Sequence, residues 1–158
     1  MQESDDKKKA YFDKMLEHYT AIELNLDSED KIDEMIEHFI NIIQIFIWGE
    51  KNEQVFFDFF IEQHILSLFV SLAEINKKYS NEKENAIKII KFYSFFILNL
   101  KNTDIINYVY SHSNFNNFLT LEFDFDDDEV VFYYVNFVKS LSQQFDNFPF
   151  QIFYNSVS

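Results

Sequence analysis

The sequence predicts an all-α protein, an armadillo- or HEAT-like helical-repeat domain of about eight helices. Three observations support this class. Residues 56–69 and 106–119 have apolar positions in register, which indicates an internal repeat. The 158 residues contain one glycine and one proline, too few for the many tight turns of an all-β fold. Long segments carry apolar residues every three or four positions, the period of a helix with one buried face.

The internal repeat is the strongest of these signals. Each copy follows a Lys-Asn pair, at residues 51–52 and 101–102. Apolar residues coincide at six pairs of positions: Phe56 with Ile106, Phe59 with Val109, Phe60 with Tyr110, Ile65 with Phe115, Leu68 with Phe118 and Phe69 with Leu119. The offset, 102 minus 52, is near the period of about 40–47 residues of armadillo and HEAT repeats. Such stacks usually present surfaces to other proteins.

The first third of the chain predicts two long helices. Residues 1–9 are charged and are expected to be disordered, and an amphipathic helix near 6–24 carries one apolar stripe, Phe12, Leu16, Tyr19 and Ile22. The next helix begins at an N-cap in Asp27-Ser28 and runs to Trp48, and Gly49 is predicted as the left-handed residue that ends it. Residues 13–22 resemble 33–42, which indicates that the two helices pack together.

Shorter helices are predicted in the middle of the chain, from Asn52 to about Glu62 and over 64–79, 82–100, 103–112 and 114–122. Asn81 is expected to cap the helix at 82–100, which should turn four side chains inward: Ile87, Ile90, Phe95 and Leu98. Asp126 is expected to cap a last long helix to about Phe145, with Glu129 as its capping-box partner. Pro149 ends that helix, and residues 151–158 resemble the start of a truncated third copy.

Composition limits the possible functions. A net charge of −14 argues against binding to nucleic acid or to an anionic lipid surface, both of which need basic patches. The absence of cysteine excludes disulfides, zinc–thiolate sites and a thiol nucleophile, and is compatible with a reducing compartment. No apolar run reaches the roughly 18 residues of a spanning helix, and the N-terminus does not resemble a secretory signal.

Residues that could carry chemistry give weak signals. Asp124, Asp126 and Asp128 have the spacing of a calcium loop, but Glu129 and Val135 stand where that loop needs glycine and glutamate. We therefore interpret this segment as a solvated helix start. The four histidines lack metal-binding spacing, because Met15 and Met35 stand three residues before the first two: His18, His38, His64 and His112. One glycine also excludes the glycine-rich phosphate and nucleophile motifs. We expect no catalytic, cofactor-binding or metal-binding residues.

The 21 Phe and 9 Tyr exceed what so small a domain can bury, so some should line a groove or a partner interface. A genome rich in A and T also explains this composition, since it favours Phe and Tyr codons, and we favour that explanation over a dedicated aromatic surface. Trp48, beside Gly49, could be a core anchor or an interaction hot spot, and we favour the core.

Several ordered blocks resemble one family: IWGEKN at 47–52, VFFDFFIE at 55–62, EFDFDDDEV at 122–130, YYVNFVKSLS at 133–142 and FYN at 153–155. They are similar to the FPL domain, the N-terminal armadillo-like domain of the endosomal-maturation (Ema-type, C-type-lectin-domain-16A-like) proteins. The similarity spans about residues 30–155, and family proteins continue for hundreds of residues beyond it.

The resemblance implies a role in endosomal and lysosomal trafficking and autophagy, without a catalytic motif in this domain. We therefore expect residues 10–158 to form a single FPL-like domain, a non-catalytic scaffold on the cytosolic face of endosomes or lysosomes. It would bind protein partners through exposed aromatic residues. Two alternatives remain: an accessory subunit of a large assembly, for example mitochondrial or ciliary, and an accessory to ubiquitin-ligase machinery.

Overall fold

The computed structural model describes residues 2–51 and 53–146, and all regular elements within these ranges are helical. A 3-10 turn (Glu29–Lys31) joins the first two helices. The α-helices are α1 (Gln2–Asn25), α2 (Ile32–Glu50), α3 (Gln54–Glu62), α4 (Ile65–Tyr79), α5 (Lys83–Asn99), α6 (Thr103–Ser111), α7 (Ser113–Leu119) and α8 (Asp128–Asp146). The predicted all-α class with about eight helices is confirmed.

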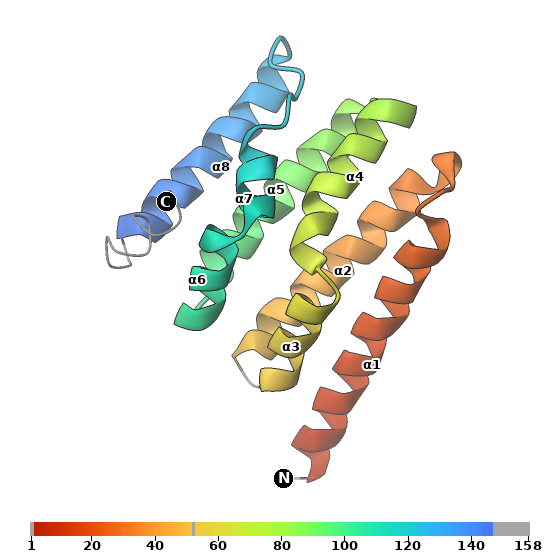
Figure 1. Ribbon diagram of the computed structural model, residues 1–158, viewed down its shortest axis with the longest axis vertical. Coiled ribbons are helices and arrows are strands. Elements are labelled where there is room, and N and C mark those ends of the chain that lie inside the picture. The colour runs from red at the N-terminus through yellow and green to blue at the C-terminus, as the bar shows by residue number, and fades with distance from the viewer. Residues whose placement is uncertain (1, 52, 147–158) are drawn as a thin grey trace.

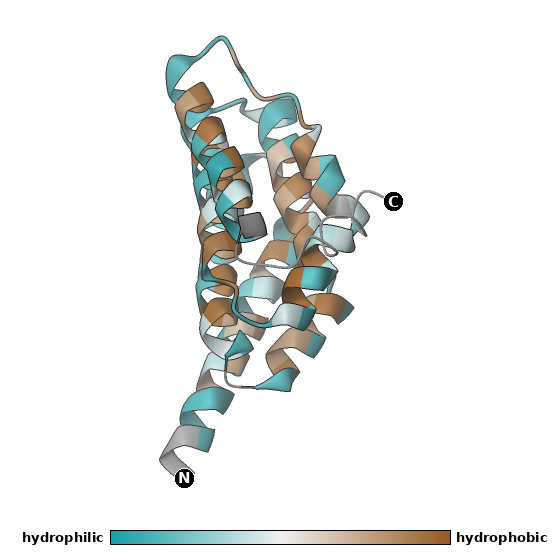
Figure 2. Ribbon diagram, turned by 90° about the vertical axis from the view of Figure 1, so that its left-hand side faces the viewer, coloured by the Kyte–Doolittle hydropathy of each residue, from teal (hydrophilic) through white to brown (hydrophobic). Residues whose placement is uncertain are grey.

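The helices form two layers (Figures 1 and 2). The long helices α1, α2, α5 and α8 lie side by side in this order, and the shorter helices α3, α4, α6 and α7 cover one face of that layer. Figure 1 shows α1 and α8 at opposite ends of the stack. The large apolar core lies between the layers and draws side chains from every helix.

The predicted repeat is confirmed in three dimensions, because α2–α3–α4 and α5–α6–α7 are successive units of the stack. Of the twelve matched side chains, eleven are buried in the core, and Leu119 packs against it. The two units also touch each other: Phe60 of the first unit stacks on Phe96 of the second, with ring centroids 5.6 Å apart. Contact between neighbouring units is what stabilises a repeat stack.

The predicted pairing of the first two helices is also confirmed, since α1 lies along α2. Met15 and Met35, which coincide in the similar segments, are both fully buried. The stripe predicted on α1 is partly wrong, because Leu16 is exposed while Met15 is inside. Residues 2–9 are helical rather than disordered, and Lys8 Nζ lies 2.6 Å from Glu53 Oε1, which ties this end of α1 to the start of α3.

Gly49 does not have the role predicted for it. It lies within α2, which continues to Glu50, and its φ angle is not positive. A Cβ at this position would overlap the ring of Phe56, so the glycine allows α3 to approach the last turn of α2 closely. The sequence therefore signals a close contact here, and not a helix end.

Three predicted caps are also wrong. Asn81 is left-handed (φ 49°) and follows the end of α4, and its amide donates to the Asn76 carbonyl. The cap of α8 is Asp127, one residue after the predicted Asp126, because its Oδ1 accepts from the amides of Glu129 (2.9 Å) and Val130 (3.2 Å). Ser28 precedes the 3-10 turn, and its side chain makes no capping hydrogen bond.

The inward face of α5 is predicted only in part. Ile87 and Ile90 are buried, whereas Phe95 and Leu98 are exposed; Tyr93, Phe96 and Ile97 are inside instead. The apolar residues of this helix occupy both of its faces, so periodicity alone could not assign the buried one. The truncated third copy predicted for 151–158 lies outside the described residues, as does Asn52, the expected start of α3.

Candidate protein-interaction surface

Most aromatic side chains serve the core, and binding of a partner through the exposed ones stays a prediction. Among the described residues four aromatic side chains are exposed: Tyr79, Phe95, Phe125 and Phe132. Trp48 is partly buried and packs against the core, with its ring 4.7 Å from that of Tyr11 and 5.9 Å from that of Phe56. The exposed aromatic residues are thus a small set, and three of them lie in α5, in α8 or in the segment before α8.

Apolar residues are exposed along one side of α8, the helix at one end of the stack in Figure 1. We call this surface the α8 edge and define it by three residues, Phe132, Val135 and Val138. Tyr133 and Phe137 face the opposite way, toward α5: Lys91 Nζ lies 5.3 Å from the Tyr133 ring, and the Phe137 and Tyr93 rings are 5.3 Å apart. Because Val135 and Val138 are out of phase with Phe137, the α8 edge points away from the rest of the stack.

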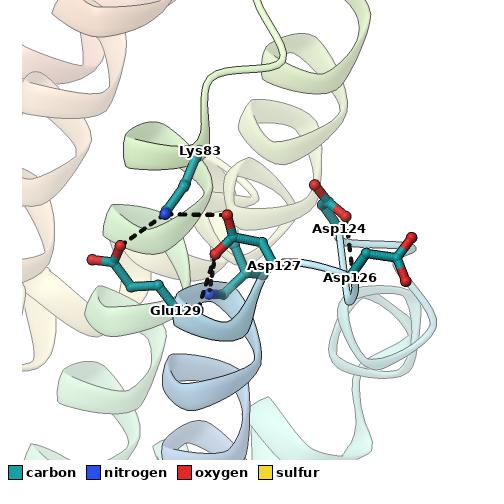
Figure 3. A network of polar contacts seen from close by, with 6 residues as sticks. Lys83, Asp124, Asp126, Asp127 and Glu129 are labelled. Carbon is teal, nitrogen blue, oxygen red and sulfur yellow. Dashed lines mark hydrogen bonds and ion pairs between the residues drawn. The ribbon is translucent and has the colours of Figure 1, made fainter.

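The carboxylates before α8 have two different environments, which Figure 3 shows. Lys83 of α5 bridges Asp127 and Glu129, with Nζ 3.1 Å and 2.9 Å from their oxygens. The Lys83 ammonium lowers the pKa of Asp127 below its ordinary value, and the amide of Val130 contributes to this shift. Asp124 and Asp126 lie apart from this bridge, and Asp124 Oδ1 accepts from the Asp126 amide at 3.2 Å.

These contacts agree with the interpretation of the acidic segment as a helix start. The 1-3-5 aspartates predicted as a poor calcium loop do not converge, because Asp124 closes a local turn and the Asp126 carboxylate points away from it. Within residues 2–51 and 53–146, no group of three or more His, Asp or Glu side chains could hold a metal ion. That no residue binds a cofactor or metal stays a prediction.

The histidines form contacts with one another rather than with a nucleophile. His18 Nδ1 and His38 Nδ1 are 2.9 Å apart, so one ring donates to the other when both are neutral. Burial lowers the pKa of His18, and His38 and Lys14 lower it further. His64 is left-handed at the start of α4. The ring of His112 lies 5.1 Å from that of Tyr108. Burial of the His112 side chain lowers its pKa, and the charge interaction with His64 lowers it further.

A cleft of about 520 Å³ lies between the α4–α5 turn and residues 120–124. Its walls include apolar side chains such as Ala73, Ala86 and Val130, and two lysines, Lys77 and Lys83. Both lysines already contact acidic residues of the molecule, Lys77 at Glu122 and Lys83 at Asp127 and Glu129. The lining contains no histidine, so no imidazole is available as a general base there.

One buried carboxylate that the sequence analysis did not single out joins the two repeats. Glu50, at the end of α2, accepts hydrogen bonds from the amides of Lys101 (2.8 Å) and Asn102 (3.0 Å), just before α6. Asn102 then caps α6 through its own side chain. Trp48, Gly49 and Glu50 therefore each have a structural role, in packing, close approach and turn stabilisation.

Membrane crossing by one helix is not indicated. Within the described ranges no single helix is both long and apolar enough to span a bilayer. The bent pair α3 and α4, at 47°, reaches the required length and hydropathy only as two helices together. Many of their apolar side chains, including Phe56, Phe60 and Phe69, are buried in the core.

Stacked three-helix units define the class of this protein, an armadillo-like helical-repeat domain. The model of the FPL family, described as an uncharacterised conserved protein, matches residues 39–158. The chain therefore belongs to the FPL family.

Curated relatives share this region. The chain is 29% identical over 145 residues to a CLEC16A homolog of Drosophila melanogaster, covering 89% of the chain and 13% of the relative. It is 26% identical over 121 residues to CLEC16A of Homo sapiens, covering 77% and 11%. It is 28% identical over 119 residues to TRANSPARENT TESTA 9 of Arabidopsis thaliana, covering 75% and 14%. The chain thus spans a small part of the length of these relatives. A comparison with solved structures gives no match.

Proposed function

We propose that this domain is a non-catalytic protein–protein interaction scaffold in endosomal and lysosomal trafficking and autophagy, at the cytosolic face of these organelles. The observation that carries the interaction role is the α8 edge, an exposed apolar surface at the end of a helical-repeat stack. Exposed apolar patches of this kind mark interaction sites, and repeat stacks commonly bind proteins. The trafficking setting is supported by membership of the FPL family and by the similarity to CLEC16A proteins.

The arrangement of the polar side chains gives little support to a catalytic function. His18 and His38 pair with each other, and the Lys83 ammonium is held between two carboxylates. An enzyme of the hydrolytic kind needs a nucleophile beside an oriented base. The side chains that line the 520 Å³ cleft do not supply that pair.

Affinity purification from the native cells tests the proposal with a matched pair of variants. Val135→Asp places a charge on the α8 edge, and Val55→Asp places the same charge on an equally exposed valine of α3 (43% and 46% exposed). We expect the wild-type chain and Val55→Asp to recover the same endolysosomal proteins, and Val135→Asp to lose them. Recovery of a mitochondrial or ciliary complex instead would reject the trafficking role.

The uncovered end of the stack also favours a second candidate, an accessory subunit held permanently in a large assembly. Such an end would then be buried in the assembled state, as obligate interfaces are. Native electrophoresis of a cell extract separates the two candidates. A free scaffold migrates largely near the size of the unassembled protein, whereas a subunit is found only at the size of the complex.

A further inference from the structure

Within the stack, each long helix covers the side of the preceding long helix that would otherwise be exposed. The side of α2 that faces along the stack is covered by α5, where the Phe46 and Phe96 rings are 6.0 Å apart. The corresponding side of α5 is covered by α8 through Tyr93 and Phe137. The corresponding side of α8 is the α8 edge, and no described helix covers it (Figure 1). The occupant that this geometry fits is another helix with an apolar stripe.

Each covered junction also contains polar pairs near the N-terminal ends of its helices. Between α2 and α5, Glu37 Oε1 lies 3.1 Å from Lys88 Nζ, and Asp33 Oδ1 accepts from Asn85 Nδ2 at 2.7 Å. Between α5 and α8, Lys83 bridges the carboxylates of Asp127 and Glu129. Opposite charges at such junctions fix the register of two neighbouring helices.

Near the N-terminus of α8 the exposed carboxylates include those of Asp126, in the turn before the helix, and Asp128, whereas the lysine of this helix, Lys139, lies about three turns further along. Asp126 and Asp128 are exposed, and none of the described lysines forms an ion pair with them. Asp127 and Glu129 differ, because both form an ion pair with Lys83. A positive charge on the occupant of the α8 edge would complement Asp126 and Asp128.

We infer that the α8 edge binds an amphipathic helix of another protein. Its apolar residues cover Phe132, Val135 and Val138, and a lysine or arginine near one end pairs with Asp126 and Asp128. This inference rests on the proposed scaffold role and names the chemistry of the partner. Affinity comes from the apolar stripe, and the basic end sets the orientation of the helix, since an exposed ion pair contributes little affinity.

The test is a selection from a phage-displayed library of amphipathic helical peptides, panned on the full chain. The library keeps one apolar stripe and varies the flanking positions among Lys, Glu and Ser. We expect enriched peptides to keep the stripe and to carry Lys at one end. Fluorescence anisotropy then measures the affinity of an enriched peptide for each variant. Val135→Asp should weaken binding at least about tenfold, and Val55→Asp by less than about twofold.

A charge-neutralised variant tests the orientation of the helix. Asp126→Asn/Asp128→Asn should abolish the preference for a Lys-ended over a Glu-ended peptide, and raised ionic strength should do the same. Circular dichroism confirms that each variant is folded. Val138→Ser is a second, milder change at the α8 edge, and we expect it to weaken binding too.

Several outcomes would overturn the inference. One is a selection that enriches no apolar stripe, and another is equal loss in Val55→Asp and Val135→Asp. A third is a dimer of the wild-type chain that Val135→Asp dissociates in sedimentation, because the occupant is then a second copy. A fourth is a gain of about tenfold in Phe150→Ser/Phe153→Ser, because the occupant is then the chain's own C-terminal residues.

The selection and the affinity purification can fail separately. Peptide binding at the α8 edge without recovery of endolysosomal proteins rejects the cellular role and leaves this inference standing. Recovery of those proteins equally by wild type and Val135→Asp, with no peptide binding, rejects the α8 edge as the docking surface while the scaffold role survives.

Discussion

At the scale of single residues, Gly49 shows how packing can require a glycine without any special backbone angle. A Cβ there would overlap the ring of Phe56, which is fully buried. Gly49→Ala should therefore destabilise the fold by about 1–3 kcal/mol, the usual cost of overpacking, despite the higher helix propensity of alanine. Urea denaturation measures this. Gln44→Ala, at an exposed position of the same helix, is the control and should stay within about 0.5 kcal/mol of wild type. Equal stabilities would contradict the close contact.

Tyr93 places a hydroxyl in the core without a hydrogen-bond partner among the described residues. Burial raises its pKa well above the ordinary value. Tyr93→Phe removes this unsatisfied group, so we expect unchanged or higher stability, by up to about 1 kcal/mol. Tyr134→Phe is the matched control, because the Tyr134 hydroxyl donates to the Leu119 carbonyl at 3.2 Å. It should lose about 0.5–1.5 kcal/mol. Thermal unfolding measures the stability of both variants. A clear loss of stability in Tyr93→Phe would mean that the Tyr93 hydroxyl has a hydrogen-bond partner.

The His18–His38 pair makes stability depend on pH. Burial, His38 and Lys14 lower the pKa of His18, while Glu17 opposes the shift. The unfolded chain therefore binds a proton at His18 more readily than the folded chain does. Stability should be complete above the unfolded pKa of about 6.5 and should fall as the pH drops below it. In urea titrations at several pH values, His18→Gln should show a shallower loss below that point. A slope equal to that of wild type would contradict this role of the pair.

At the scale of helices, Glu50 joins the two repeats through the amides of Lys101 and Asn102. Glu50→Gln keeps the shape but leaves one acceptor oxygen for two amides. One hydrogen bond becomes a weaker neutral one, and the other is lost because the NH2 group of glutamine cannot accept. We expect a loss of about 1–2 kcal/mol. Glu37→Gln is the control: it breaks the exposed ion pair with Lys88 and should cost less than about 1 kcal/mol. Denaturant unfolding compares them, and equal effects would show that Glu50 does not stabilise the turn before α6.

Helix existence could be predicted from the sequence, but several helix ends could not. The carboxylates at 124, 126, 127 and 128 are all candidate caps by local rules, and the structure uses Asp127, which also meets Lys83 of α5. The local signal at Asn81 is ambiguous in the same way, because asparagine suits both an N-cap and a left-handed helix end. Asn76 forms hydrogen bonds with residues on both sides of the turn. These bonds place Asn81 at the end of α4.

At the scale of the whole molecule, the repeat made the fold predictable, since matched residues such as Phe59 and Val109 are buried in equivalent places. The interaction surface was less predictable. Residues 130–138 (VVFYYVNFV) are apolar on nearly all sides, which is the signal of a helix expected to be covered on two faces. The face of α8 that is covered depends on its contacts with α5 and α7, which join residues far apart in the sequence. Sequence reasoning therefore indicated exposed aromatic residues without locating the α8 edge.

The central claim is that α8 closes the described stack with one face buried and the other open. The chain has no cysteine, so single cysteines report on this directly. Val109→Cys, Val130→Cys and Val135→Cys place one thiol in the core of α6, one on the buried face of α8 and one on the α8 edge. Under native conditions we predict that the thiol at 135 reacts with Ellman's reagent at least about a hundredfold faster than the other two, which need an opening of the structure. Equal rates at 130 and 135 would contradict the account.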